Sequence, residues 1–86
     1  MPESFEAAIV LPAALHARPA GALVRATASF DATVEICYGD RTANVRGVLA
    51  VLALGAPAGS TVVIRASGPD ATPALKAALD CLATAQ

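Results

Sequence analysis

The pattern of hydrophobic and polar residues along the chain predicts four strands and three helices. The segment Thr33–Tyr38 alternates strictly, with Val34, Ile36 and Tyr38 on one face, which is typical of a half-buried strand. Elsewhere apolar residues recur three and four positions apart, and this spacing predicts amphipathic helices. We expect strands at Glu3–Val10, Thr33–Tyr38, Arg41 to about Val45 and Thr61–Ser67, and helices at Ala17 to about Ser29, Val48–Ala53 and Pro73–Ala85.

Turn-forming residues separate these segments. Gly39-Asp40 is typical of a tight hairpin turn, and Gly55 ends the second helix. Thr72 is the expected N-cap of the last helix, with Pro73 at the first helical position, where a missing N–H is tolerated.

The resulting order β-α-β-β-α-β-α favours an α+β fold. A chain of 86 residues has room for one hydrophobic core, so we predict a single domain over residues 1–86. Strands with one apolar face, combined with three helices, predict an open-faced sandwich. In this fold a four-stranded antiparallel sheet is covered on one face by the helices.

Composition and charge narrow the function. Six basic against seven acidic residues give a net charge of −1, which argues against nucleic-acid binding. The apolar stretches are too short to span a bilayer, so we expect a cytoplasmic, monomeric protein without membrane insertion. Cys37 and Cys81 lie far apart without metal-ligand spacing, and we interpret them as free thiols used in packing.

The only histidine, His16, stands where the first loop meets the first helix. The start of a helix offers unpaired backbone N–H groups and the positive end of the helix dipole, which together stabilise an anion. Arg18 can add a charge-assisted contact, and a neutral imidazole is a competent nucleophile near neutral pH. These features suit a phosphorylated histidine, although a capping or surface histidine is the commoner occupant of such a position.

Two segments carry a resemblance to a known family. Leu15–Ala20, with the sequence LHARPA, resembles the active-site stretch of HPr, the phosphocarrier of the bacterial phosphoenolpyruvate-dependent sugar phosphotransferase system. Arg46–Gly55, with the sequence RGVLAVLALG, is similar to the short second helix of that family and its closing glycine. Chain length, element order, Gly59 and Gly68 also agree, so the resemblance covers essentially the whole chain.

The resemblance implies a phosphoryl carrier and not a free-standing enzyme. His16 would be phosphorylated on a ring nitrogen, Nδ1 in the family, by phosphorylated enzyme I, and would pass the group to an enzyme IIA domain. Arg18 would steady the phosphoryl group, with the backbone of Ala17 and Arg18 in contact with it. No cofactor and no metal are expected in the carrier itself.

The second helix is apolar almost all round, and such a short helix on an open-faced sheet cannot bury every side. Val51 and Leu54 suit the core as well as a docking surface. The family resemblance implies a partner surface that joins the two helices, made of Ala17, Gly21, Arg25, Val48, Leu49 and Leu52.

Three positions depart from the family pattern. Gly47 stands where many members carry a regulatory serine, so no hydroxyl is available there for a kinase. Ala13 and Ala14 replace an Asn or Ser and a Gly just before the Leu-His pair, which removes a polar side chain near the phosphoryl site.

The sequence also suits two other functions. One is a regulatory binding module of the same fold, including the nitrogen-branch type, in which the phosphorylation state of His16 controls a target protein. The other is a small interaction domain in which His16 is incidental.

Overall fold

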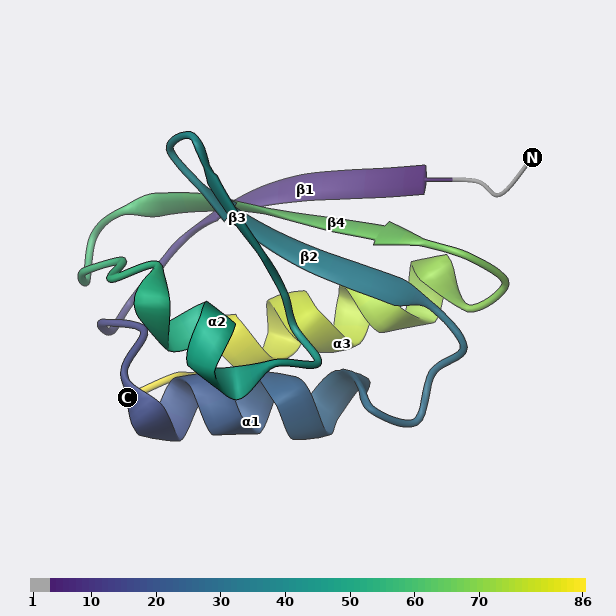
Figure 1. The fold of residues 1–86 in the computed structure, drawn as a ribbon, viewed down its shortest axis with the longest axis horizontal. Helices are drawn as coiled ribbons and strands as arrows, with labels where there is room; N and C mark the ends of the chain where they lie inside the picture. Colours follow the sequence, from purple (N-terminus) through teal and green to yellow (C-terminus); the bar gives the residue numbers. More distant parts are fainter. Residues whose placement is uncertain (1–3) are drawn as a thin grey trace.

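The computed structural model describes residues 4–86 and contains the strands and helices that the hydrophobic pattern predicts. The four strands form one antiparallel sheet in the spatial order β1-β4-β2-β3, and the three helices cover one of its faces (Figure 1). The predicted open-faced α+β sandwich is therefore confirmed. In chain order the elements are β1 (Ser4–Val10), α1 (Ala17–Thr27), β2 (Thr33–Tyr38), β3 (Arg41–Asn44), α2 (Val48–Ala53), β4 (Thr61–Ser67) and α3 (Ala71–Ala83).

The core lies between the sheet and the helices, and aliphatic side chains fill it. In the two central strands Val34 pairs with Ala66 and Ile36 with Ile64, and the alternation that predicted the strands turns all four side chains toward the helices. From the helical layer, Leu23 is completely buried. A core of this kind fixes the register of the sheet, because a one-residue slip would move its apolar side chains to the open face.

The open face of the sheet carries an exposed ionic row. The guanidinium of Arg65 donates to the carboxylate of Glu6 with an Nε–Oε2 distance of 3.1 Å, and it lies 3.8 Å from Glu35. Arg65 is the register partner of both residues, so the row runs straight across three strands. Exposed pairs of this kind add little to stability.

The predicted start of the last helix was wrong by two residues. α3 begins at Ala71 with Asp70 as its N-cap residue, and it ends at Ala83 instead of Ala85. Thr72 is therefore not the cap. The carboxylate of Asp70 accepts the backbone N–H of Asp31 at 2.7 Å, and the N–H of Asp70 donates back to the Asp31 carbonyl at 3.0 Å. This contact joins residues 39 positions apart and holds the residue before α3 against the loop after α1.

The same region shows why one glycine is needed. Gly68 has φ +112°, a conformation that L side chains rarely adopt. A Cβ at this position would lie 3.3 Å from both the Ala32 Cα and the Asp31 carbonyl oxygen. Two loops can therefore approach each other closely here only because residue 68 has no side chain.

The other predicted boundaries differ by small amounts. α1 ends at Thr27, and the expected extension to Ser29 is not helical. The Thr27 hydroxyl donates to the Leu23 carbonyl at 3.0 Å. β3 ends at Asn44, one residue before Val45. The predicted first residue of β1, Glu3, lies outside the described residues. Among residues 4–86, no helix has the length and apolar character required to cross a bilayer.

Candidate functional site

His16 is the N-cap residue of α1. Its backbone is extended, with φ −91° and ψ −169°, and its carbonyl accepts the N–H of Ala20 at 3.0 Å, which begins the helical hydrogen bonding. The side chain makes no capping hydrogen bond and is exposed. The imidazole is therefore open to solvent, and its nitrogens are not used to cap the helix.

Backbone hydrogen bonds hold the loop before His16 against the loop that precedes β4. The buried Leu15 donates its N–H to the Ala56 carbonyl at 2.9 Å. Further back, Leu11 and the 59–60 segment bond reciprocally, with Gly59 N to Leu11 O at 2.8 Å and Leu11 N to Ser60 O at 2.9 Å. The loop that carries His16 is therefore held in place by backbone hydrogen bonds to the loop before β4.

The first turn of α1 leaves two backbone N–H groups directed out of the helix. The N–H groups of Ala17 and Arg18 have no acceptor within the helix, as expected for a helix start, and none elsewhere in residues 4–86. The next residue, Pro19, has no N–H to offer. Two free amides and the positive end of the helix dipole therefore lie next to the exposed ring, an arrangement that favours negative charge.

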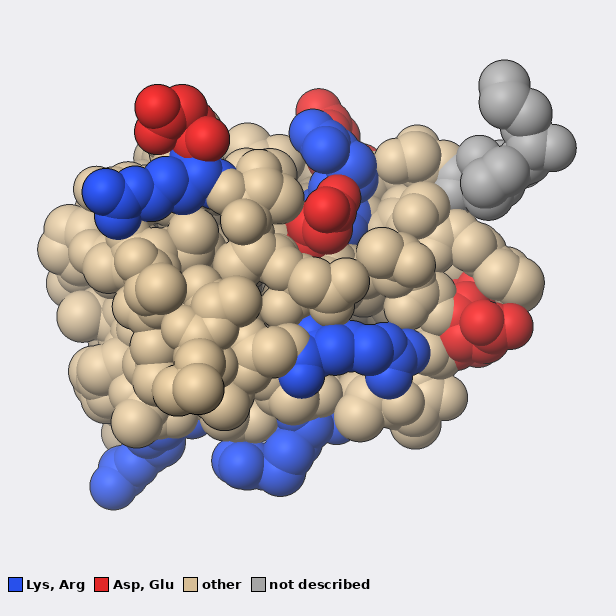
Figure 2. Space-filling view, viewed as in Figure 1, with Lys and Arg blue, Asp and Glu red and all other residues tan. Residues whose placement is uncertain are grey.

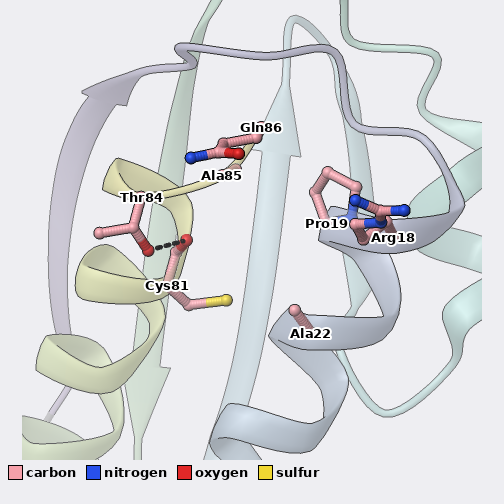
Figure 3. A pocket seen from close by; sticks show the side chains of 7 residues that line it. All are labelled: Arg18, Pro19, Ala22, Cys81, Thr84, Ala85 and Gln86. Carbon is pink, nitrogen blue, oxygen red and sulfur yellow. Dashed lines mark hydrogen bonds between the residues drawn. The ribbon is translucent and has the colours of Figure 1, made fainter.

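Arg18 makes no hydrogen bond to His16 among the described residues. Its side chain is exposed, and no hydrogen bond or ion pair from its guanidinium is found among the residues that the structure describes. It lies instead at a cavity of about 270 Å³ between the start of α1 and the end of α3 (Figure 3). The cavity is lined by Arg18, Pro19, Ala22, Cys81, Thr84, Ala85 and Gln86.

His16 borders a different hollow. This hollow has a volume of about 430 Å³ and is formed by Ala14, Leu15, His16, Leu52, Gly55, Ala56 and Pro57. The sequence pattern did not indicate that residues 55–57 form its wall. The sequence indicates Gly55 only as the end of α2, a role that suits its φ of +65°. The contact between this segment and the His16 loop joins parts of the chain that are distant in sequence.

The apolar residues of α2 divide between core and surface. Val51 is completely buried and Leu54 is 4% exposed, so both belong to the core. Val48 is 38% exposed and Leu49 is 77% exposed, whereas Leu52 is half-buried beside the His16 hollow. The structure therefore leaves part of the apolar surface of α2 uncovered, as the short helix predicted.

The other residues of the predicted partner surface lie on α1, which packs beside α2 (Figure 1). Ala17 and Arg25 are exposed, and Gly21 is half-buried. A Cβ on Gly21 would lie 3.3 Å from Nη1 of Arg25, so the arginine side chain passes close over the glycine.

The charged residues of α1 are all basic. α1 carries Arg18 and Arg25 and no acidic residue, and in Figure 2 blue atoms project from the side where α1 lies without red atoms beside them. Acidic atoms appear instead around the sheet and at one end of the molecule. The exposed apolar residues of α2 thus accompany a neighbouring helix whose charged residues, Arg18 in the first turn and Arg25 in the last, are both basic.

Gly47 is the N-cap residue of α2 and is exposed. Its φ of −105° suits any residue, and an added Cβ would meet Ala50 Cβ at 3.7 Å, an ordinary contact. The backbone would therefore accept a serine, but this chain offers no hydroxyl at that position.

The two cysteines are free thiols and both are half-buried, as expected. Burial raises the pKa of the Cys81 thiol, and the nearby positive charge of Arg25 opposes this effect. Within the described part of the chain, no group of three or more histidine, cysteine or acidic residues is arranged to hold a metal ion.

Comparison with known proteins relates this geometry to a family. The family model for the PTS HPr component phosphorylation site matches residues 3–84. A multiphosphoryl transfer protein of Xanthomonas campestris pv. campestris is 37% identical over 74 residues, which cover 86% of this chain and 9% of that protein. The chain thus corresponds to a small part of this much longer relative.

Two solved structures agree with the fold over nearly the whole chain. Phosphocarrier protein HPr from Bacillus anthracis is 26% identical with a TM-score of 0.86, covering 92% of this chain and 96% of that chain. The histidine-containing phosphocarrier protein of Mycoplasma is 29% identical with a TM-score of 0.79, covering 92% and 90%. The chain therefore belongs to the HPr family, the phosphocarrier proteins of the phosphotransferase system.

Proposed function

We propose that this protein carries a phosphoryl group on His16, accepting it from phosphorylated enzyme I and donating it to an enzyme IIA domain. The observation that supports this most strongly is the exposed imidazole at the start of α1, with no capping bond, beside the unpaired amides of Ala17 and Arg18. The name of the Mycoplasma relative, a histidine-containing phosphocarrier, is consistent with it.

The transfer is a displacement at phosphorus. A ring nitrogen of neutral His16, Nδ1 by family resemblance, attacks the phosphorus atom, and an N–P bond forms as the bond from phosphorus to the donor breaks. The other ring nitrogen keeps its proton during the attack, so the ring is first an imidazolium cation and becomes neutral when that proton leaves to solvent, while the added negative charge sits on the phosphoryl oxygens. The amides of Ala17 and Arg18 and the dipole of α1 stabilise that charge.

Arg18 supplies the mobile part of the site. Its exposed guanidinium has no partner within residues 4–86, so moving toward the phosphoryl group breaks no existing hydrogen bond or ion pair. Rotamer changes of exposed side chains are fast compared with catalytic turnover. We infer that Arg18 leaves the cavity at the end of α3 and contacts the phosphoryl group during transfer.

The partners are proposed to dock over α1 and α2. The exposed apolar side chains of Val48 and Leu49, with Leu52 at the edge, supply the apolar centre of this surface. Ala17, Gly21 and Arg25 complete it on the side of α1. The carrier would work as a cytoplasmic monomer, without a cofactor of its own, and would not bind nucleic acid.

Phosphorylation by a purified partner tests the proposal. The protein is incubated with phosphoenolpyruvate, Mg²⁺ and enzyme I, and the acid-labile, base-stable phosphoryl group is quantified. We expect one group per chain, none in His16→Ala, and transfer of the label to an enzyme IIA domain. The absence of labelling in the wild-type protein would overturn the proposal, and labelling without onward transfer would favour a regulatory binding module instead.

Two arginine variants test whether Arg18 acts through a direct contact with the phosphoryl group or only through the overall charge of the protein. Hydrogen bonds to charged groups are worth about 1.5–3 kcal/mol, so Arg18→Ala should slow transfer roughly 10- to 100-fold without unfolding the protein. The matched control is Arg41→Ala, which removes an exposed arginine from β3. Equal rates in the two variants would remove Arg18 from the site.

A further inference from the structure

The side chain of Arg46 connects the turn before α2 to the loop after α1. Its Nη2 donates to the Phe30 carbonyl at 3.3 Å and to the Ala32 carbonyl at 3.5 Å. Both carbonyls belong to the loop that follows α1, whereas Arg46 lies two residues before Val48, the first residue of α2. Within residues 4–86, the other side-chain hydrogen bond of the β3–α2 turn is local: the Arg46 N–H donates to Oδ1 of Asn44, at the end of β3, at 2.9 Å.

α2 depends on such external ties because it has little stability of its own. It contains six residues, far fewer than an isolated helix needs in water. Its N-cap residue, Gly47, makes no side-chain capping bond, and its first turn has no acidic residue. Position and order must therefore come from contacts with the rest of the protein.

The ties of α2 are unequally distributed. In its middle and at its end, Val51 and Leu54 are buried in the core, and the Ala56 carbonyl beyond the helix accepts the Leu15 N–H at 2.9 Å. At the start, Val48 and Leu49 are exposed. The hydrogen bonds of Arg46 are therefore the side-chain restraint nearest to the most exposed apolar residues of the helix.

We propose that Arg46 is a positioning residue, which holds the entry of α2 against the loop after α1 and so sets the place of Val48 and Leu49 relative to α1. The proposal rests on the proposed function, because these residues form the docking surface assigned to the partners. Arg46 acts here through the two carbonyls of its own chain. It differs in this respect from Arg25, which is assigned to the docking surface itself.

The chemistry of the side chain makes the role testable. A guanidinium is a planar group with several donors, and one of its nitrogens can serve two neighbouring carbonyls. The ammonium of a lysine keeps the charge but cannot reproduce that planar geometry. Arg46→Lys should therefore retain part of the effect, and Arg46→Ala none of it.

The first measurement uses the unphosphorylated protein alone. Amide hydrogen exchange by NMR follows the N–H of Val51, which donates to the Gly47 carbonyl at 3.1 Å in the first turn of α2. We expect exchange about three- to tenfold faster in Arg46→Ala, an intermediate rate in Arg46→Lys, and the wild-type rate in the control Arg41→Ala. Exchange of the Val51 amide at the wild-type rate in Arg46→Ala would overturn the proposal. This outcome does not depend on whether the protein functions as a phosphoryl carrier.

The second measurement concerns docking. In phosphorylation by enzyme I, Arg46→Ala should raise the KM for this protein about three- to tenfold with kcat within about twofold of wild type. The KM of Arg46→Lys should lie between those of Arg46→Ala and the wild-type protein. If Arg46→Lys had the wild-type KM while Arg46→Gln and Arg46→Ala were equally impaired, the side chain would act through its charge on the partner, and the positioning role would be rejected.

Discussion

Replacement of Gly21 by alanine should stabilise the protein. Gly21 lies near the middle of α1, and glycine in a helix interior is less favourable than alanine by about 0.8–1.0 kcal/mol. Against this gain stands one contact, because the new Cβ would lie 3.3 Å from Nη1 of Arg25. That atom is the far end of an exposed, flexible side chain, so a small rotation removes the conflict at a cost of a few tenths of a kcal/mol, roughly.

The net gain expected for Gly21→Ala is about 0.5–1 kcal/mol in the free energy of unfolding. For a domain of this size, that gain corresponds to a rise in Tm of roughly 2–8 °C, measured by circular dichroism or calorimetry. Ala22→Gly is the matched control one position further on, and it should lower Tm by a similar or larger amount. If Ala22→Gly lowered Tm while Gly21→Ala lowered it too, Arg25 would be held tightly against the helix and the reasoning would be refuted.

Two further predictions concern the loops and the thiols. Gly68→Ala forces an L side chain into φ +112° and against the Asp31–Ala32 backbone, and it should destabilise the protein by about 2 kcal/mol or more in urea unfolding; a loss below about 0.5 kcal/mol would mean that the two loops separate easily. Burial raises the pKa of Cys81, so in a Cys37→Ser background its alkylation by iodoacetamide should increase with pH only at more alkaline values than for a free cysteine. An alkylation profile equal to that of free cysteine would contradict this burial.

The regular elements could be predicted because their signals are local. The bounds of α2 and β4 agree with the predicted Val48–Ala53 and Thr61–Ser67, since a glycine or proline lies near each end and the hydrophobic period inside is clear. The start of α3 could not be predicted in the same way. Asp70 becomes the N-cap residue while its carboxylate binds the backbone of Asp31, a contact between residues 39 positions apart.

The candidate site was only partly predictable for the same reason. His16 and the unpaired amides follow from a histidine placed directly before a helix, which a sequence reveals. The wall of Gly55, Ala56 and Pro57 beside the ring depends on how two distant loops pack. The side-chain direction of Arg18 also depends on packing, because the end of α3 provides the cavity that Arg18 borders.

NMR of the phosphorylated protein tests most directly the claim that the start of α1 holds a phosphoryl group on His16. A single phosphorus signal should couple to the His16 ring, and the amide protons of Ala17 and Arg18 should shift more than any others as they bind the phosphoryl oxygens. A phosphorus signal on another residue, or unchanged amides at Ala17 and Arg18, would contradict the account.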